Sequence, residues 1–193
     1  MNDTQLLFVT GNASKFYEAS SVCKEFGIEL MQETADIDEI QHHDPVTITK
    51  AKAESAYQAV GKPVVVNDSS WSIPAYNGFP GGYMKDVTSW FSTEDFIHLM
   101  KNKSDKRIIL TETVVYMDEH NTEIFIHKRT GQLIDEPKGK SLPTFTRVLV
   151  MDGEGVTVSQ VFDQGNWEII EERYKHWYDF AKWYRDVYLS SAK

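Results

Sequence analysis

The first half of the chain alternates short apolar runs with amphipathic stretches. The apolar runs predict three short strands, at residues 6–9, 28–31 and 64–66. The last run is three consecutive valines, which is typical of a strand covered on both faces, as in a parallel sheet. Residues 14–26 and 45–60 repeat apolar or small side chains at helical spacing, so we expect two helices that end at Gly27 and Gly61. The order is therefore βαβαβ.

The second half is antiparallel in character. Paired β-rich runs predict two hairpins, one over 107–117 with 122–128 and one over 144–151 with 156–162. Residues 77–82 are too rich in Gly and Pro for a regular element, and flanking aromatics favour a functional loop. A helix or a pair of helices follows, through residues 90–100. An aromatic stripe then predicts one long amphipathic helix over 167–189.

Composition limits the classes of protein that fit. The 193 residues are enough for one α/β domain, or for two lobes that share a cleft. No apolar run is long enough to cross a bilayer and the amino terminus lacks the features of a signal peptide, so we expect a cytoplasmic protein. The net charge of −9 argues against a protein that holds long nucleic acid, but it allows a small anionic ligand. The single cysteine, Cys23, fits a half-buried packing role.

A strand gives way through a glycine turn to a helix at residues 10–15. The amide hydrogens at the start of a helix favour a phosphate, and Lys15 would add a positive charge in the first turn. Lysine there opposes the helix dipole, so its presence is explicable if it faces an anion. The alternative is a structural helix cap, because Gly-Asn turns with a nearby lysine are common.

A carboxylate directly follows the valine run. Asp68, preceded by Asn67, lies where open α/β sheets bind ligands, beyond the carboxyl ends of the strands. It could therefore act as a general base or a metal ligand. The alternative is that Asp68 caps the next turn through backbone amides.

The loop at residues 36–44 is acidic. Asp36, Asp38 and Glu39 offer hard oxygen ligands that suit magnesium, although most charged loops are merely solvated and that remains the default interpretation for Asp36 and Asp38. The adjacent His42 and His43 have no nearby residues that would complete a zinc site, so we do not assign them to a metal.

Taken in order, these segments resemble the inosine triphosphate pyrophosphatase family, the non-canonical purine NTP pyrophosphatases. The matching stretches are residues 8–12 with Lys15, 36–41, 50–53, 61–69, 77–81 with Tyr83 and, more weakly, 125–139. The first is similar to the family's amino-terminal signature and the second to its acidic metal loop. The block from 61 to 83 is the strongest. An ordered set of this kind is far more specific than any of its pieces.

The resemblance implies magnesium-dependent hydrolysis of a nucleoside triphosphate to the monophosphate and pyrophosphate. It implies that Glu39 and Asp68 bind Mg²⁺ and that Asp68 is also the base for the attacking water. It further implies substrate contacts at Thr10, Gly11, Asn12, Lys15, Lys52, Ser69, Lys85 and His176. The chemistry agrees, because attack at the α-phosphorus needs an oriented water and neutralised phosphate oxygens. Without the resemblance, Lys52 and Lys85 are ordinary surface charges.

Three positions depart from the family pattern. Asn67 stands where members usually carry an acidic residue, so one carboxylate of the metal environment is missing. Residues 141–147 replace the Phe-Gly-aromatic-Asp-Pro motif that encloses the purine, and residues 175–177 replace the Ser-His-Arg motif. Trp177 would offer a stacking face in place of a cationic donor, so we expect broad or shifted base selectivity. The alternative for His176 is that it borders the apolar face of its helix.

We therefore predict one domain over residues 1–193, an α/β fold with an elongated mixed sheet, helices on both sides, and two lobes with a central nucleotide cleft. The family typically forms homodimers, and we expect no contact with long nucleic acid or membrane. One rival is the septum-formation-inhibitor type of nucleotide pyrophosphatase, which shares the fold and prefers other bases. The other is a nucleotide-binding regulatory protein without catalysis, against which the retention of Glu39 and Asp68 weighs.

Overall fold

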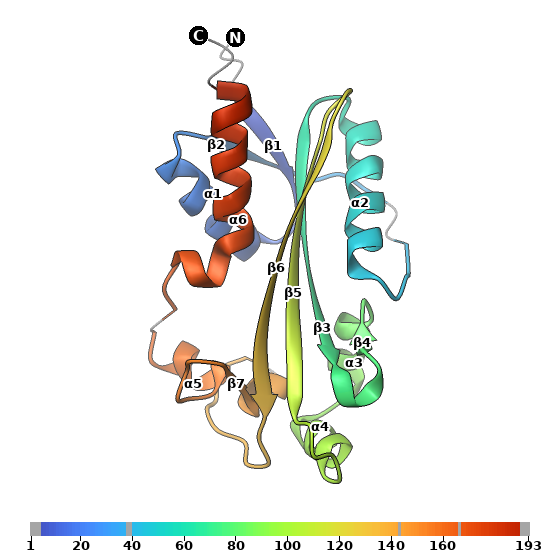
Figure 1. The fold of residues 1–193 in the computed structure, drawn as a ribbon, viewed down its shortest axis with the longest axis vertical. Helices are drawn as coiled ribbons and strands as arrows, with labels where there is room; N and C mark the ends of the chain where they lie inside the picture. Colours follow the sequence, from blue (N-terminus) through green and yellow to red (C-terminus); the bar gives the residue numbers. More distant parts are fainter. Residues whose placement is uncertain (1–4, 38–39, 143, 166, 190–193) are drawn as a thin grey trace. The chain divides into compact units, whose positions relative to one another are not determined.

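A mixed sheet of seven strands organises the chain (Figure 1). The computed structural model describes residues 5–37, 40–142, 144–165 and 167–189. The first half contains β1 (Gln5–Val9), α1 (Ala13–Glu25), β2 (Glu29–Glu33), α2 (Pro45–Val60) and β3 (Val64–Ile73). The strand order is β2-β1-β3-β5-β6-β7, and β4 pairs with β3. β1 runs parallel to β2 and β3, which confirms the predicted βαβαβ order.

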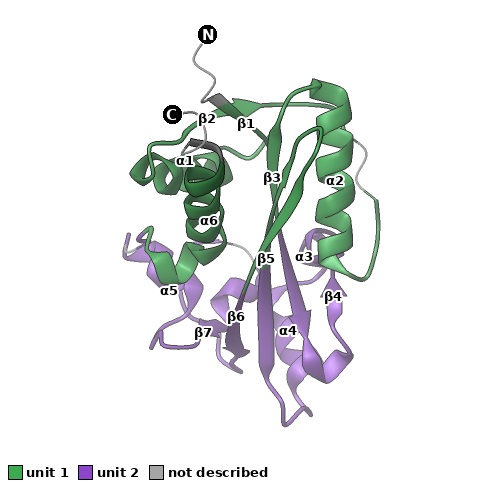
Figure 2. Ribbon diagram, turned by 45° about the horizontal axis from the view of Figure 1, so that its top comes forward, with its two compact units in different colours: residues 1–68, 112–127, 169–193 green, residues 69–111, 128–168 purple. Residues whose placement is uncertain are grey.

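Two compact units divide the chain (Figure 2). Unit 1 comprises residues 1–68, 112–127 and 169–193, and unit 2 comprises residues 69–111 and 128–168. The strands β3, β5 (Arg107–Met117) and β6 (Thr122–Leu133) contribute residues to both units. The division agrees with the two lobes expected from the sequence. The nucleotide cleft stays a prediction.

In unit 1, helices cover both faces of the parallel strands. Figures 1 and 2 show α1 and α6 (Glu171–Tyr184) on one face and α2 on the other. Side chains along a strand alternate between the faces. Val64 and Val66 therefore share a core with Ala53 of α2. On the opposite face, Phe8 packs edge-on against Trp177 of α6, with 5.0 Å between the ring centroids.

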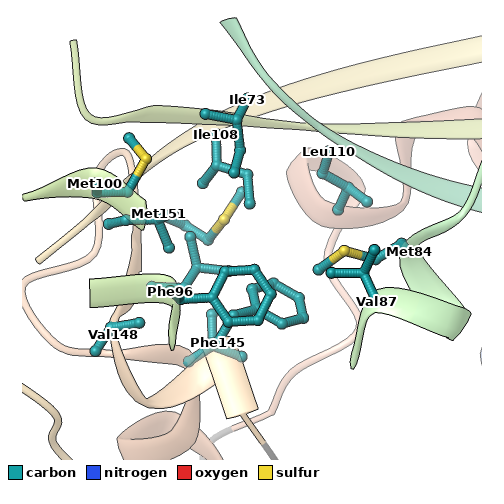
Figure 3. Close-up of a cluster of buried hydrophobic side chains, with 13 residues drawn as sticks. Ile73, Met84, Val87, Phe96, Met100, Ile108, Leu110, Phe145, Val148 and Met151 are labelled. Carbon is teal, nitrogen blue, oxygen red and sulfur yellow. The ribbon is translucent and has the colours of Figure 1, made fainter. Parts of the chain in front are cut away.

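Unit 2 has a hydrophobic core of its own, formed under α3 (Met84–Trp90) and α4 (Thr93–Met100). Figure 3 shows Phe96 and Phe145 among methionine and aliphatic side chains, and their ring centroids lie 5.6 Å apart. The short strands β4 (Phe79–Gly81) and β7 (Leu149–Met151) pair antiparallel with β3 and β6. The two helices confirm the pair expected before the hairpin. The expected loop at 77–82 contains β4.

The second predicted hairpin is wrong. β7 pairs with β6, and the run expected to be its partner instead forms the helix α5 (Val158–Asp163). A capping box explains the helix: Thr157 Oγ1 accepts a hydrogen bond from the Gln160 N–H, and the Gln160 side chain accepts one from the Thr157 N–H. This local signal outweighs the β propensity of the valines on either side.

Three further elements differ in length from the prediction. β3 continues to Ile73 and β6 to Leu133, beyond the ends expected at residues 66 and 128. α6 begins at Glu171, four residues later than expected, and passes into a π-helical turn at Arg185–Leu189. None of the helices in the described part of the chain combines the length and the apolar character that crossing a bilayer requires.

Cys23 lies on α1 and is completely buried, which is deeper than the sequence suggested. Burial raises the pKa of its thiol, because the interior disfavours the thiolate. The packing role expected for this residue is confirmed.

Candidate active site

The turn after β1 is a helix cap. Asn12 Oδ1 accepts hydrogen bonds from the N–H groups of Ser14 (2.9 Å) and Lys15 (3.2 Å). Thr10 Oγ1 accepts one from the Asn12 N–H, at 3.1 Å. The structural alternative considered for these residues is therefore confirmed. Gly11 is exposed, and apart from its two chain neighbours no described residue has an atom within 4 Å of the place a Cβ would take. The turn thus stays open to a ligand on its outer side.

Lys15 and Asp68 form an ion pair at this turn. Lys15 Nζ lies 3.6 Å from Asp68 Oδ1, and the two side chains remain 24% and 34% exposed. An ion pair this exposed contributes at most about 1 kcal/mol to stability. The pair therefore does little for the fold and remains accessible to a ligand.

Strand register explains why these two residues meet. Leu7 is opposite Val64 and Phe8 is opposite Val65, and β1 ends at Val9. Asp68 therefore lies beyond the end of β1, level with the turn that follows it. The sequence placed Asp68 after the end of its own strand, which is wrong because β3 continues to Ile73. The strand that ends beside it is β1, so Asp68 still lies at the ligand-binding edge of the parallel strands.

Asn67 lies on the opposite face of β3 and is buried. Its Nδ2 donates to the Thr113 carbonyl oxygen at 3.1 Å and to Glu112 Oε2 at 3.4 Å. His176 Nε2 lies 3.8 Å from the same Glu112 oxygen. Three polar side chains from β3, β5 and α6 therefore converge on the α1 and α6 face of the sheet.

Glu18 extends this polar group along α1, one helical turn beyond Lys15. Burial is the largest effect on the Glu18 carboxyl and raises its pKa, and the negative charge of Glu112 raises this pKa further. A hydrogen bond with Tyr174 and the positive charge of Lys15 act in the opposite direction and lower the pKa. The net effect is upward, so this carboxyl holds its proton more tightly than an exposed glutamate.

Glu18, Glu112 and Tyr174 were not identified from the sequence. A signal for Glu18 was present, because residues three apart on a helix share a face and Lys15 was already a candidate. Glu112 is the only charged residue between Arg107 and Asp118 in a strand that is otherwise apolar or hydroxylic. That interruption was a second signal. Nothing in the sequence indicated that Tyr174 would hydrogen-bond to α1.

The remaining candidates are not all brought together. Lys52 is half-buried on α2, in unit 1. Ser69 and Lys85 belong to unit 2, half-buried on β3 and exposed on α3 respectively. Glu39, the predicted metal ligand, lies outside the described residues. His176 is only 2% exposed.

Trp177 does not offer a stacking face, and that interpretation of the sequence was wrong. The indole is 1% exposed, and Phe8 and Phe180 pack edge-on against it. The reason is the apolar stripe of α6, which puts this position in the core. Phe145, within the segment that replaces the purine motif, is also buried, in the core of unit 2.

The Asp68 carboxylate is a hard oxygen donor of the kind that magnesium prefers. Glu112 and Asn67 carry further oxygen donors, but they lie on the opposite face of the sheet. In the part of the chain that the structure describes, no group of three or more His, Cys, Asp and Glu side chains forms a ready-made metal site. Mg²⁺ typically takes only one or two carboxylates and completes its shell with water and substrate phosphate, so the residues fit this ion.

Comparison with known proteins adds to this picture. The model of the Ham1 family matches residues 6–182. The chain is 27% identical to the dITP/XTP pyrophosphatase of Methanopyrus kandleri, covering 94% of this chain and 97% of that protein. It is 30% identical to the inosine triphosphate pyrophosphatase of Candida glabrata, covering 83% of this chain and 88% of that protein.

Solved structures show the same fold. A HAM1 protein from Coxiella burnetii superposes with a TM-score of 0.79 at 16% identity, covering 95% of this chain and 99% of that chain. The Ham1 protein of Staphylococcus aureus gives a TM-score of 0.72 at 17% identity, covering 98% of this chain and all of that chain. The mixed α/β fold predicted from the sequence is confirmed.

Proposed function

The chain belongs to the Ham1 family, and we propose that it hydrolyses a nucleoside triphosphate to the corresponding monophosphate and pyrophosphate. The observation that carries the proposal is the accessible Lys15–Asp68 pair at the end of β1. It places a carboxylate and a cation beside an open glycine turn, at the edge where parallel strands bind ligands. The names of the similar proteins, dITP/XTP and inosine triphosphate pyrophosphatases, support the same reaction.

Asp68 is the proposed base. It accepts a proton from a water whose oxygen attacks the α-phosphorus, and the bond from that phosphorus to the bridging oxygen of the β-phosphate breaks. Pyrophosphate leaves with the bonding electron pair. A positioned base of this kind typically contributes about 10²–10⁴-fold to the rate. Lys15, which lies 3.6 Å from Asp68, neutralises phosphate oxygens on which charge develops.

We propose the other candidate residues as substrate contacts. Thr10, Gly11 and Asn12 form the open turn beside Lys15. Lys52, Ser69 and Lys85 remain proposed phosphate contacts, on the strength of the family resemblance. The proposal for His176 changes, because a side chain this buried has little surface to offer a base. We assign it a positioning role through Glu112.

We propose Mg²⁺ as the cofactor, with Asp68 and Glu39 as ligands. When bound, a divalent cation supplies positive charge to phosphate oxygens and orients the triphosphate.

The test is product analysis over a nucleotide panel with Mg²⁺. The panel contains ITP, XTP, dUTP, an oxidised purine triphosphate and the canonical triphosphates. We expect pyrophosphate and monophosphate from at least one of them, with broad or shifted base selectivity because both base-reading motifs are altered. Release of a diphosphate and inorganic phosphate, or no hydrolysis of any member, would contradict the proposal.

One observation favours a second candidate, a nucleotide-binding protein without catalysis. Asn67 removes a carboxylate that the family usually has, which lowers the expected affinity for the cation. The panel separates the two candidates, since the second binds a nucleotide without turnover.

We further propose a cytoplasmic homodimer. Both statements rest on the family resemblance and the composition. Sedimentation velocity tests the dimer, which requires a species of twice the 22.2 kDa chain mass.

A further inference from the structure

We propose that Glu112 binds the sugar of the nucleotide: its carboxylate accepts a hydrogen bond from a ribose hydroxyl, so the protein prefers ribonucleoside triphosphates to their 2′-deoxy forms. This inference rests on the proposed function, because it takes the phosphates to lie at Lys15 and Asp68. It names the class of sugar, whereas the altered segments at 141–147 and 175–177 concern the base.

Lys15 connects the two faces of the sheet at the end of β1. Its Nζ lies 3.6 Å from Asp68 Oδ1, and its positive charge also acts on the carboxyl of Glu18. Glu18 lies three residues further along α1, and residues at this spacing share a helix face with about 5–6 Å between their Cβ atoms. The charge of Glu112 acts on the same carboxyl. A sugar that directly follows phosphates held at Lys15 can therefore lie beside Glu18 and Glu112, and all of these residues belong to unit 1.

The carboxylates are the more accessible members of a polar group on this face. The Glu112 side chain is 16% exposed and Glu18 is half-buried, whereas Asn67 and Tyr174 are each 5% exposed and His176 is 2% exposed. Asn67 Nδ2 donates to Glu112 Oε2 at 3.4 Å, and His176 Nε2 lies 3.8 Å from the same oxygen. Tyr174 hydrogen-bonds to Glu18. The buried side chains thus hold the two carboxylates, which keep surface for a ligand.

An ionised carboxylate selects the kind of group that it binds. Its oxygens only accept hydrogen bonds, and they offer about four lone-pair sites, so Glu112 can accept from protein neighbours and from a ligand together. Phosphate oxygens and base carbonyls are acceptors as well, so they are not bound. Ribose hydroxyls are donors, and every ribonucleotide carries them. In dinucleotide-binding folds an aspartate or glutamate likewise accepts from the ribose 2′-OH.

An amino group of the base is the other donor that a nucleotide could turn toward Glu112. Position favours the sugar, because the sugar lies between phosphate and base and Glu18 is only one helical turn from Lys15. The two contacts are separable by experiment. Comparing two nucleotides that share a base and differ only at the 2′ position isolates the sugar contact.

The experiment measures the Kd of ITP and dITP, and of UTP and dUTP, by calorimetry with Mg²⁺. It uses Asp68→Asn protein, which should bind nucleotide without turnover. We expect the ribonucleotide of each pair to bind about 10–100-fold more tightly, the range typical of a hydrogen bond to a charged group. The parent protein should show the same preference in kcat/KM.

Glu112→Gln in the same protein keeps the size of the side chain and an oxygen that can accept from Asn67, so it removes mainly the charge. We expect the preference for the ribonucleotide to fall about five- to tenfold, because a charge-assisted hydrogen bond becomes a neutral one. The affinity for dITP and dUTP should stay nearly unchanged, whereas a general disruption of the site would weaken both members of a pair alike. Glu54→Gln, the same change at an exposed position on α2, is the matched control and should keep the full preference.

Equal binding of the two members of each pair would overturn the inference, and this comparison decides the matter even if Glu112→Gln does not fold. A Glu112→Gln protein that keeps the full preference, or that loses affinity for both members alike, would also overturn it. Failure of the proposed function is seen separately. A protein that prefers the ribonucleotides and hydrolyses none of them keeps the inference and loses the function, whereas one that hydrolyses both members of each pair equally well keeps the function and loses the inference.

Discussion

At the scale of single residues, Asp68 carries the chemistry. We expect Asp68→Asn to lower kcat about 10²–10⁴-fold with little change in stability, because the amide keeps the volume and loses the proton acceptor. Steady-state pyrophosphate release measures the rate, and calorimetry measures nucleotide binding, which should persist. The control is Asp152→Asn, the same change at an exposed position in the turn after β7. A kcat within a few-fold of the parent would remove Asp68 from the role of base.

Trp177 belongs to the core of unit 1, and its substitution should show that. The indole is 1% exposed against Phe8 and Phe180. Trp177→Ala should therefore lower the free energy of unfolding by about 3–5 kcal/mol, measured by urea denaturation. The ratio of rates for two different bases should not change. A variant as stable as the parent, with altered base selectivity, would restore the stacking role that the sequence suggested.

The sequence predicts single residues well where a motif defines them, and poorly where only the fold brings them together. The turn at Thr10–Asn12 was identifiable because its position after a strand has a chemical meaning, and Asp68 because it belongs to an ordered set of family motifs. Glu112 and His176 meet from segments 64 residues apart in sequence, and no local pattern indicates that contact. The interpretation of Trp177 was wrong because the residue is buried. Its helical spacing shows that it lies on the apolar face of α6, but does not show whether that face remains accessible to a ligand.

At the scale of elements, the segment at 138–141 is held to α5 and its cap. The Lys140 and Ser141 N–H groups donate to the Asp163 carboxylate, at 2.7 and 2.8 Å. Thr157 Oγ1 donates to the Lys138 carbonyl oxygen at 2.9 Å. These contacts fix Ser141, the first residue of the segment that replaces the family's purine motif, within unit 2.

Gly139 makes this close packing possible. Its φ is +88°, and a Cβ would lie 2.5 Å from Ser159 Oγ and 2.8 Å from the Gln160 nitrogen. Gly153 has a similar φ, +82°, with no described atom within 4 Å of that place. Gly153→Ala should thus cost only backbone strain, about 1 kcal/mol. Gly139→Ala should cost about 1–3 kcal/mol more from overpacking. Urea denaturation of both variants measures the difference, and equal losses would contradict the contact.

The amino-terminal cap of α2 should make stability depend on pH. Asp44 accepts hydrogen bonds from the Thr47 hydroxyl at 2.6 Å and from the N–H groups of Val46 and Thr47, each at 3.2 Å. The Thr47 hydroxyl bond is the main cause that lowers the pKa of the Asp44 carboxyl. A lowered pKa stabilises the folded state above the unfolded pKa, and the effect is lost as the pH falls through the folded pKa.

Asp44→Ala should therefore cost about 1 kcal/mol at pH 7, and the difference from the parent should shrink below about pH 4. Thermal unfolding of the two proteins across this range measures it. A difference that stays constant down to pH 2 would show that the charge of Asp44 does not contribute.

Elements were predicted well where one period continues over many residues, as in α1, α2 and β5. The prediction failed at residues 156–162, because a capping box of four residues decided between helix and strand. The predicted ends of β3 and β6 were too early. The polar residues that follow those predicted ends belong to the strands themselves and not to loops.

At the scale of the whole molecule, the family and the mixed sheet were predictable because motifs occur in the same order along the chain. The match to the Ham1 family over residues 6–182 confirms that prediction. The division into two units agrees with the predicted lobes. How a nucleotide binds could not be predicted, since base selectivity depends on side chains that only tertiary packing places.

The central claim is hydrolysis at the α-phosphorus, and the fate of the water oxygen tests it most directly. The best substrate of the panel is hydrolysed in water enriched in ¹⁸O with Mg²⁺, and the products are weighed by mass spectrometry. Our account predicts one ¹⁸O atom in the nucleoside monophosphate and none in the pyrophosphate. Label in the pyrophosphate, or in inorganic phosphate released together with a diphosphate, would contradict it, because water would then have attacked the β- or γ-phosphorus.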